Sequence, residues 1–178
     1  LIKQNGWLKI ISLGPGVIGK KKAIEKGILE STGKIIVCTD GDCVVPHNWL
    51  KSYSDFYTNQ PEMAMIFGPV RYKNDQSLFA DILNIELSIL QVIGGATMNL
   101  GFPTMINGAN FSYQKTIFNE VSGYSENEHI PSGDDEFLLR KIHLKYPGRI
   151  QFLKDNSAIV DTLPPESFKT LIDQRKRW

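Results

Sequence analysis

Short apolar runs alternate with amphipathic segments along this chain of 178 residues. Apolar runs bounded by turn-forming residues predict strands at 8–13, 35–39, 63–70, 150–153 and 158–160, and one more within 105–113. A period of 3.6 residues predicts helices at 20–31, 46–57, 77–94, 115–121 and 134–144, and a last helix from Pro164-Pro165 into Arg177. Strands that alternate with helices favour a single α/β domain over residues 1–178, with a mostly parallel sheet.

The segment 77–94 carries an unusually wide apolar surface for one helix. Its apolar positions include Leu78, Ile82, Ile85, Ile89 and Val92. Such a surface usually packs into a protein core, and we expect that outcome here. The alternative is a face that rests on a membrane or on missing parts of the protein.

Charge and composition narrow the class of protein. Twenty Lys and Arg nearly balance nineteen Asp and Glu, which removes the argument for a general nucleic-acid binder. There is no signal-peptide pattern and no uninterrupted run of about 18 apolar residues, so we expect the chain as given to be soluble. Cys38 and Cys43 would not readily reach disulfide geometry, which indicates a reduced, cytosolic environment.

Two acidic clusters carry the candidate chemistry. Asp40 and Asp42 follow the apolar run 35–39, which places them at the carboxyl end of a buried strand. Open α/β sheets bind ligands at that edge, and carboxylates on either side of a glycine can share a hard cation with water and phosphate oxygens. Asp134 and Asp135 open a helix, where the dipole favours negative charge. The pattern predicts a protein that handles a metal-bound phosphate ester.

The residues alone leave several interpretations open. Residues 14–20 fit both GxGxxG and GxxxxGK, although Lys21 stands where a P-loop needs Ser or Thr and Asp40 only loosely supplies the acid of a dinucleotide fold. A glycine-rich turn with solvated lysines is the simpler interpretation. Residues 40–44 also fit the opening motif of aspartate-nucleophile phosphatases, with the second acidic cluster as the magnesium acids. The acids could also form only a solvated turn, or belong to a non-catalytic binding domain.

A larger ordered set of motifs resembles family 2 glycosyltransferases. It comprises Gly19-Lys20, Ala23, Gly27, Gly33, Asp40-Gly41-Asp42, Asn107-Gly108-Ala109-Asn110, Gly123, Gly133-Asp134-Asp135 and Gln174-Arg175-Lys176-Arg177-Trp178. The resemblance covers residues 19–178 and is greatest to membrane-bound members, including the synthases of cellulose, hyaluronan and chitin, whose final motif is QxxRW. Any one motif is weak, whereas the ordered set is specific.

This resemblance implies a GT-A fold and an inverting transfer of sugar from a nucleotide-sugar, usually UDP-linked, to a hydroxyl of a glycan or lipid. It implies that Asp42 binds Mg²⁺ or Mn²⁺ on the donor diphosphate and that Asp40 lies nearer the sugar and nucleoside. Lys20 and Arg177 are the implied diphosphate contacts. Asp135 matches the general base, which takes a proton from the acceptor hydroxyl.

The remaining implied roles concern the acceptor and the missing parts of the protein. Asp134, Gln174 and Trp178 are implied acceptor contacts, and Trp178 offers a flat apolar face to a sugar ring. Glu25 departs from the family, since many relatives have asparagine there. Relatives also begin with a strand, a helix and a second strand that hold the nucleobase. We therefore expect a chain that is N-terminally incomplete and inactive alone, from a parent protein held by missing flanking segments at the cytoplasmic face of the cell membrane.

Overall fold

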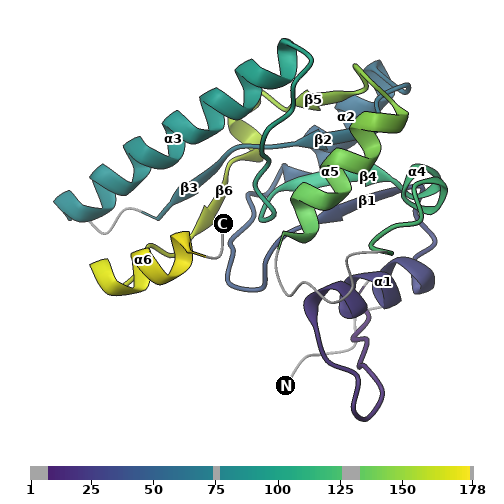
Figure 1. Cartoon of the computed structure of the whole chain (residues 1–178), viewed down its shortest axis with the longest axis horizontal. Helices are drawn as coiled ribbons and strands as arrows, with labels where there is room; N and C mark the ends of the chain where they lie inside the picture. The colour runs from purple at the N-terminus through teal and green to yellow at the C-terminus, as the bar shows by residue number, and fades with distance from the viewer. Residues whose placement is uncertain (1–7, 74–76, 126–132, 177–178) are drawn as a thin grey trace.

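The computed structural model describes residues 8–73, 77–125 and 133–176 (Figure 1). The helices are α1 (Lys20–Glu30), α2 (Trp49–Asn59), α3 (Leu78–Asn99), α4 (Lys115–Glu120), α5 (Asp134–Lys145) and α6 (Phe168–Arg175), with a 3-10 turn η1 (Asn156–Ala158). The strands are β1 (Ile35–Cys38), β2 (Met65–Phe67), β3 (Val70–Tyr72), β4 (Phe111–Gln114), β5 (Ile150–Phe152) and β6 (Val160–Thr162). The predicted α/β class is confirmed.

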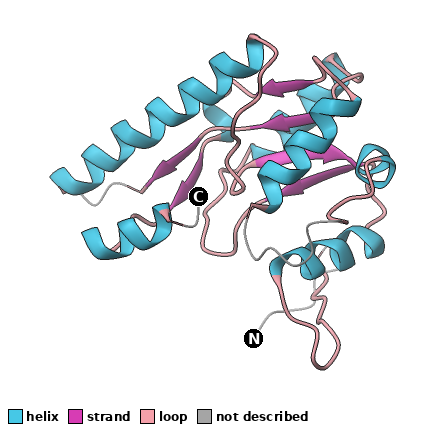
Figure 2. Cartoon of the chain, viewed as in Figure 1, coloured by secondary structure: helices cyan, strands magenta, loops and turns pink. Residues whose placement is uncertain are grey.

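The strands form two sheets (Figure 2). The larger sheet has the order β1-β4-β2-β5, in which β4 is antiparallel to both of its neighbours and β2 is parallel to β5. Three of its strands therefore run in one direction and β4 runs against them. The smaller sheet pairs β3 with β6 in parallel. The apolar run predicted as one strand at 63–70 is two strands, because the Gly68-Pro69 turn carries the chain from one sheet to the other.

Two apolar cores lie on opposite faces of the larger sheet. Side chains alternate along β2, so Met65 and Phe67 contribute to the first core and Ile66 to the second. The first core is closed by apolar residues of α1, α4 and α5, and the second by residues of α2, α3 and the smaller sheet. The larger sheet is thus a central layer, and its β1 end faces α1.

The strand predicted at 8–13 is wrong. The segment is a loop whose residues are mostly exposed, tied to α1 by a hydrogen bond from Lys26 to the Ser12 carbonyl oxygen and by a Lys9–Glu30 ion pair. An apolar run becomes a strand only where another strand pairs with it, and this one has no such partner among the described residues. Residues 14–20 therefore lack the preceding strand that the P-loop and dinucleotide interpretations require.

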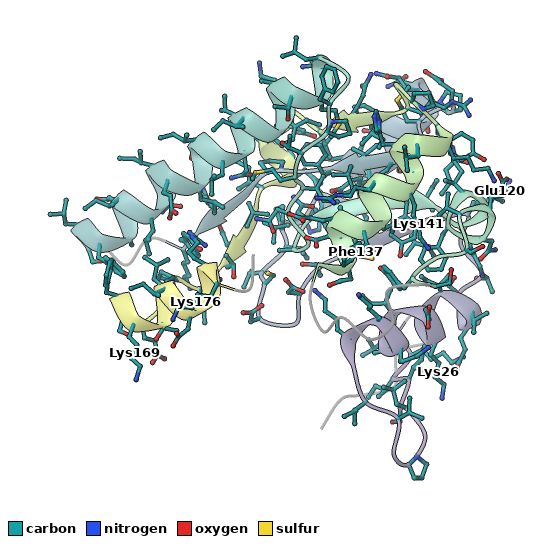
Figure 3. The ribbon with its side chains drawn as sticks, in the orientation of Figure 1. Lys26, Glu120, Phe137, Lys141, Lys169 and Lys176 are labelled. Atoms are coloured by element: carbon teal, nitrogen blue, oxygen red, sulfur yellow. The ribbon has the colours of Figure 1, made fainter. Side chains whose placement is uncertain are left out.

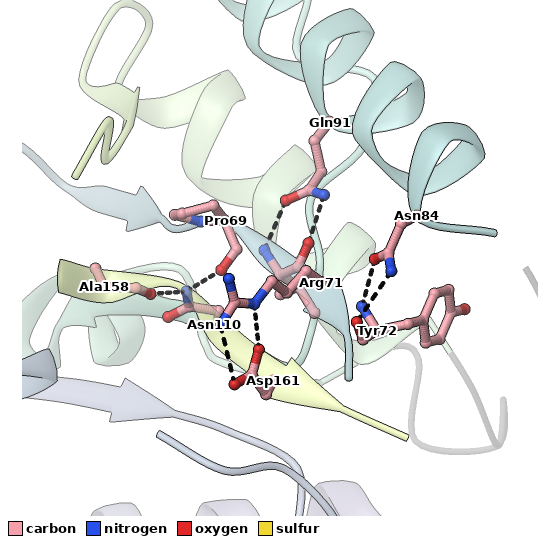
Figure 4. A network of polar contacts seen from close by, with 9 residues as sticks. Pro69, Arg71, Tyr72, Asn84, Gln91, Asn110, Ala158 and Asp161 are labelled. Carbon is pink, nitrogen blue, oxygen red and sulfur yellow. Dashed lines mark hydrogen bonds and ion pairs between the residues drawn. The ribbon is translucent and has the colours of Figure 1, made fainter. Parts of the chain in front are cut away.

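Helix α3 lies along the open edge of β3 (Figure 4). The Asn84 side chain accepts from Tyr72 N at 2.8 Å and donates to Tyr72 O at 3.0 Å. The Gln91 side chain makes the same pair of bonds with Val70, at 2.7 and 2.8 Å. The two amides supply the hydrogen bonds that a neighbouring strand would give, so they cap this sheet edge and fix α3 to it.

The opposite face of α3 is exposed. Its buried residues are Ala80, Leu83, Leu87, Gly94 and Met98. Leu78, Ile82, Ile85, Ile89 and Val92, which we call the α3 stripe, are 54 to 75% exposed. The expectation that the wide apolar surface belongs to the core is wrong for this half of it. In the described part of the chain, α3 is the one helix with the length and composition to cross a membrane, and 22% of that apolar window is buried.

The Asn110 side chain connects α2, the turn between β2 and β3, and η1. Its Oδ1 accepts from Trp49 Nε1 at 2.8 Å and from the Tyr53 hydroxyl at 2.7 Å. Its Nδ2 donates to the carbonyl oxygens of Pro69 and Ala158, both at 2.8 Å. The residue is fully buried, and these four bonds use the whole hydrogen-bonding capacity of the amide.

Substitution of this amide should be costly. Asn110→Ala leaves two donors and two carbonyl oxygens without their partner in the interior, so the free energy of unfolding should fall by about 3 kcal/mol or more. Urea denaturation followed by circular dichroism measures the change. Asn119→Ala, on the exposed surface of α4, is the matched control. A loss no larger than that of the control would show that Asn110 does not hold the elements together.

Candidate functional site

Lys20 brings the two acidic clusters into one site. Its Nζ lies 2.8 Å from Asp40 Oδ1 and 3.6 Å from Asp134 Oδ2. Lys20 opens α1, Asp40 follows β1, and Asp134 opens α5, so three elements converge here. Partial burial lowers the pKa of Lys20, but the hydrogen bond to Asp40 and the charges of Asp134 and Asp135 outweigh it and raise the pKa above its usual value. The cation is therefore a permanent part of the site.

Asp135 lies against the backbone of Gly108. A Cβ atom at residue 108 would come within 2.7 Å of Asp135 Oδ2, so a larger residue there would require the Asp135 side chain to shift. Asp135 Oδ1 accepts from Glu136 N at 3.0 Å. Burial, together with the charge of Asp134, raises the pKa of Asp135 to about 6. A carboxylate with this pKa is a much better proton acceptor near neutral pH than an ordinary aspartate.

Asp134 is the more buried of the two adjacent acids. Its side chain is almost fully covered, and its Oδ2 has no hydrogen bond within the described parts of the chain, although Lys20 lies nearby. An unsatisfied carboxylate oxygen in the interior is costly. The Lys20 ammonium, 3.6 Å away, offsets part of this cost.

Asp42 is exposed and stands apart from this cluster. A weak contact from the Cys43 thiol to Asp42 Oδ1 is 3.7 Å long, and both cysteines are unbridged. No group of three or more His, Cys, Asp or Glu that could hold a metal occurs within residues 8–73, 77–125 and 133–176. A divalent cation at Asp42 would therefore need its other ligands from outside the described residues, such as phosphate oxygens and water.

A groove of about 680 Å³ runs between α1 and β1. Its polar end contains Lys20, Asp40 and Gly41, and Gly108 lies on its wall. Most of the remaining lining residues are apolar, among them Ala23, Ile24, Ile28, Ile36, Trp49 and Phe111. The volume and the mixture of an apolar wall with a few polar groups are typical of a small-molecule site. Lys20 and Asp40 therefore line a ligand-sized groove.

The described part of the C-terminal motif, residues 174–176, lies in and directly after α6. Gln174 and Arg175 belong to α6, and no hydrogen bond or ion pair among the described residues joins α6 to Lys20, Asp40 or the acids of α5. Figure 3 shows this separation by the labelled Lys176, beside α6, and Phe137, on α5. Arg177 and Trp178, which the motif predicts as contacts, lie outside the described residues. The structure thus unites Lys20 with the acids and leaves Gln174 elsewhere.

Two residues that position other candidate residues, Gly108 and Glu86, were assigned no individual function by the sequence prediction. Gly108 leaves room for the Asp135 carboxylate. The sequence feature that could have indicated this is its place in the motif Asn107-Gly108-Ala109-Asn110. Glu86 forms an ion pair with Arg175. No local sequence feature reveals Glu86, because its partner is 89 residues away along the chain.

Comparison with known proteins agrees with the motif analysis. Residues 35–178 match the family model described as Glycosyl transferase family group 2. The chain is also similar to the poly-beta-1,6-N-acetyl-D-glucosamine synthases of Staphylococcus epidermidis and Staphylococcus aureus, each 26% identical over 161 residues. These alignments cover 90% of this chain and 38% of each relative. The chain therefore spans about two fifths of the length of these relatives.

The raised pKa of Asp135 predicts that this group lowers stability at neutral pH. Its pKa is about 6 in the folded chain against an ordinary value of 3.8, so the folded state binds the proton more tightly and loses stability as pH rises through about 6. Asp135→Asn should raise the free energy of unfolding at pH 8 by roughly 3 kcal/mol. This gain in the free energy of unfolding should disappear below about pH 3.8, the ordinary pKa of an aspartate. Urea titrations over this pH range measure it, with Asp173→Asn on exposed α6 as the control, and a gain independent of pH would contradict the assignment.

Proposed function

The chain belongs to the glycosyl transferase family group 2, and from this we propose that the protein is an inverting glycosyltransferase. It moves a sugar from a nucleotide-sugar, UDP-linked as in most relatives, to a hydroxyl group of a glycan or lipid. The mixed α/β sheet is consistent with a GT-A domain. The observation that carries the proposal is the Asp135 carboxylate, held against Gly108 beside a lysine-bridged pair of acids with a pKa near 6.

In the proposed reaction Asp135 is the general base. Its carboxylate takes the proton of the acceptor hydroxyl while that oxygen attacks the anomeric carbon. The bond between the sugar and the donor phosphate breaks, and the nucleoside diphosphate departs with the electron pair. Attack from the face opposite the leaving group inverts the anomeric centre. Asp134 would hold the acceptor through its buried oxygen, which has no hydrogen bond within the described chain.

The donor would bind from the groove to the Asp40-Gly41-Asp42 turn. The apolar wall suits the nucleoside, and Lys20 and Asp40 lie where the sugar and diphosphate would follow. Asp42 would hold Mg²⁺ or Mn²⁺, which when bound neutralises charge on the departing diphosphate. Arg177 is proposed as a second diphosphate contact, and Gln174 and Trp178 as acceptor contacts, from their places in the QxxRW motif. The names of the staphylococcal relatives support a growing polysaccharide as acceptor and N-acetylglucosamine as the sugar.

The alternative functions receive less support. In an aspartate-nucleophile hydrolase Asp40 would be the attacking carboxylate, yet here it forms an ion pair with Lys20. A non-catalytic binding domain would have no need for a buried carboxylate whose burial raises its pKa. Neither alternative explains why residues 35–178 match the glycosyl transferase family model.

We also propose that the protein works at the cytoplasmic face of the cell membrane and that the α3 stripe rests on the bilayer. The stripe is a row of exposed aliphatic side chains on a 22-residue helix. Because Asn84 and Gln91 fix the opposite face of α3 to β3, the helix would lie on the bilayer rather than cross it. It carries no Lys or Arg, so apolar contact rather than charge would provide the attraction.

The activity test uses the longest natural protein that contains this chain, with a UDP-sugar, manganese and a glycan acceptor. Asp135→Asn keeps the shape of the side chain and removes its basicity, so transfer should fall by roughly a hundredfold or more while donor binding survives. In the unmodified enzyme, the rate should fall as pH drops through about 6, because the base becomes protonated.

Asp134→Asn is the matched variant, since it changes the adjacent carboxylate. It should weaken acceptor binding and leave more activity than Asp135→Asn. If Asp134→Asn were the inactive variant and Asp135→Asn active, the wrong carboxylate would have been assigned as base. If the unmodified protein transferred no sugar from any nucleotide donor, the proposed function itself would be wrong.

The membrane proposal predicts binding of the 178-residue chain to neutral phosphatidylcholine vesicles. Ile85→Asp with Ile89→Asp places two charges in the stripe and should reduce the vesicle-bound fraction at least tenfold, since burial of each isoleucine contributes about 2 kcal/mol. Flotation on a sucrose gradient measures the bound fraction. Leu144→Asp, on the exposed side of α5, should bind as the unmodified chain does. Equal binding by all three proteins would exclude the stripe as the contact.

A further inference from the structure

Helix α6 is held to the domain by few apolar contacts. It has eight residues, none of them buried. Leu171 packs partly against the second core, while Phe168 is 66% exposed and Ile172 is 41% exposed. A helix this short needs packing or directional contacts to keep its place, because its own hydrogen bonds do not stabilise it.

The directional contact is an ion pair between α6 and α3. Arg175 Nε donates to Glu86 Oε1 at 3.0 Å, and Arg175 Nη2 donates to Glu86 Oε2 at 2.6 Å. Both ends of the carboxylate are engaged, which fixes the orientation of the guanidinium as well as its distance. The Arg175 side chain is 22% exposed and that of Glu86 is 41% exposed, so the pair is only partly shielded from water.

Glu86 offers a rigid support for this pair. It lies on α3 between Asn84 and Gln91, the two residues whose side chains hold α3 to β3. The chain of contacts therefore runs from the smaller sheet through α3 to α6. Hydrogen bonds to Glu86 and to Tyr72 of β3 outweigh the burial that lowers the pKa of Arg175, so its pKa lies above the usual value. Side chains from α3 and β3 thus both form hydrogen bonds with the Arg175 guanidinium.

We propose that Arg175 is a positioning residue whose ion pair with Glu86 fixes α6 and so sets the place of Gln174, the proposed acceptor contact that lies in this helix. Arg175 occupies a variable position of the QxxRW motif, between the glutamine and the arginine for which the proposed function gives roles. Its guanidinium is engaged with α3 rather than with the acidic site. The inference rests on the proposed function, because it assigns the ion pair a purpose in sugar transfer.

The kinetic test compares Arg175→Ala and Arg175→Lys in the longest natural protein that contains this chain. Loss of the pair should raise the KM for the acceptor by roughly ten- to hundredfold, since small displacements of a binding group have effects of this size. The urea concentration at the midpoint of unfolding should be the same for these variants as for the control variant, Lys176→Ala. Lysine keeps the charge but not the two-point contact, so it should restore only part of the loss.

Two further variants separate positioning from a general effect of charge. Lys176→Ala is the matched control, because Lys176 is in the same motif and has an exposed ion pair with Asp173 of its own helix, at 3.9 Å. It should leave the KM unchanged. The charge exchange Glu86→Arg with Arg175→Glu should recover most of the activity that either single change removes. Equal losses in Arg175→Ala and Lys176→Ala, or no loss in either, would overturn the proposal.

Hydrogen exchange on the 178-residue chain tests the same contact without any turnover. The α6 amides should exchange at least tenfold faster in Arg175→Ala than in Lys176→Ala, while those of α3 remain unchanged. Unaltered exchange in α6 would overturn the positioning role even if activity fell. If the unmodified protein transferred no sugar but the α6 amides responded as expected, the proposed function would fail, and the ion pair would be only a structural link.

Discussion

The saturated amide of Asn110 is the interaction on which the rest of the structure depends. It joins α2, the turn between β2 and β3, and η1, and it does so in a place without access to water. Gly68 shows how tightly the surroundings fit, because a Cβ there would lie 2.5 Å from Asn110 Nδ2. A buried amide that keeps every partner holds its neighbours in one arrangement, since any other leaves polar groups unsatisfied.

The same short segment also shapes the chemical site. Asn107 Oδ1 accepts from Ala109 N at 3.0 Å, which fixes the turn that presents Gly108 to Asp135. Asn110, two residues after Gly108, anchors that turn to the interior. The Asp135 carboxylate is therefore held by a backbone that cannot easily move away. Its burial costs stability and raises its pKa at once, so the feature that suits it to the proposed role of base also destabilises the fold.

Helix α3 has two faces with different tasks. One face closes the edge of β3 through two side-chain amides, and its Glu86 receives Arg175 from α6. The other face shows aliphatic side chains to the surroundings. Because the inner face is fixed by hydrogen bonds rather than by apolar packing alone, the outer stripe is held in a defined direction relative to the sheets and to the groove that contains Lys20 and Asp40.

The sequence by itself determined the elements whose signals are local, and the order of motifs that defines the family. The helices at 20–31 and 134–144 and the strand at 35–39 follow from periodicity and neighbouring turn residues, and all three are present. Only the tertiary structure decided that residues 8–13 form no strand, that 63–70 serves two sheets, that half of the α3 surface is exposed, and that Lys20 bridges Asp40 and Asp134. The physical reason is that strand pairing, burial and ion pairing depend on segments distant in the chain, which no local pattern of residues records.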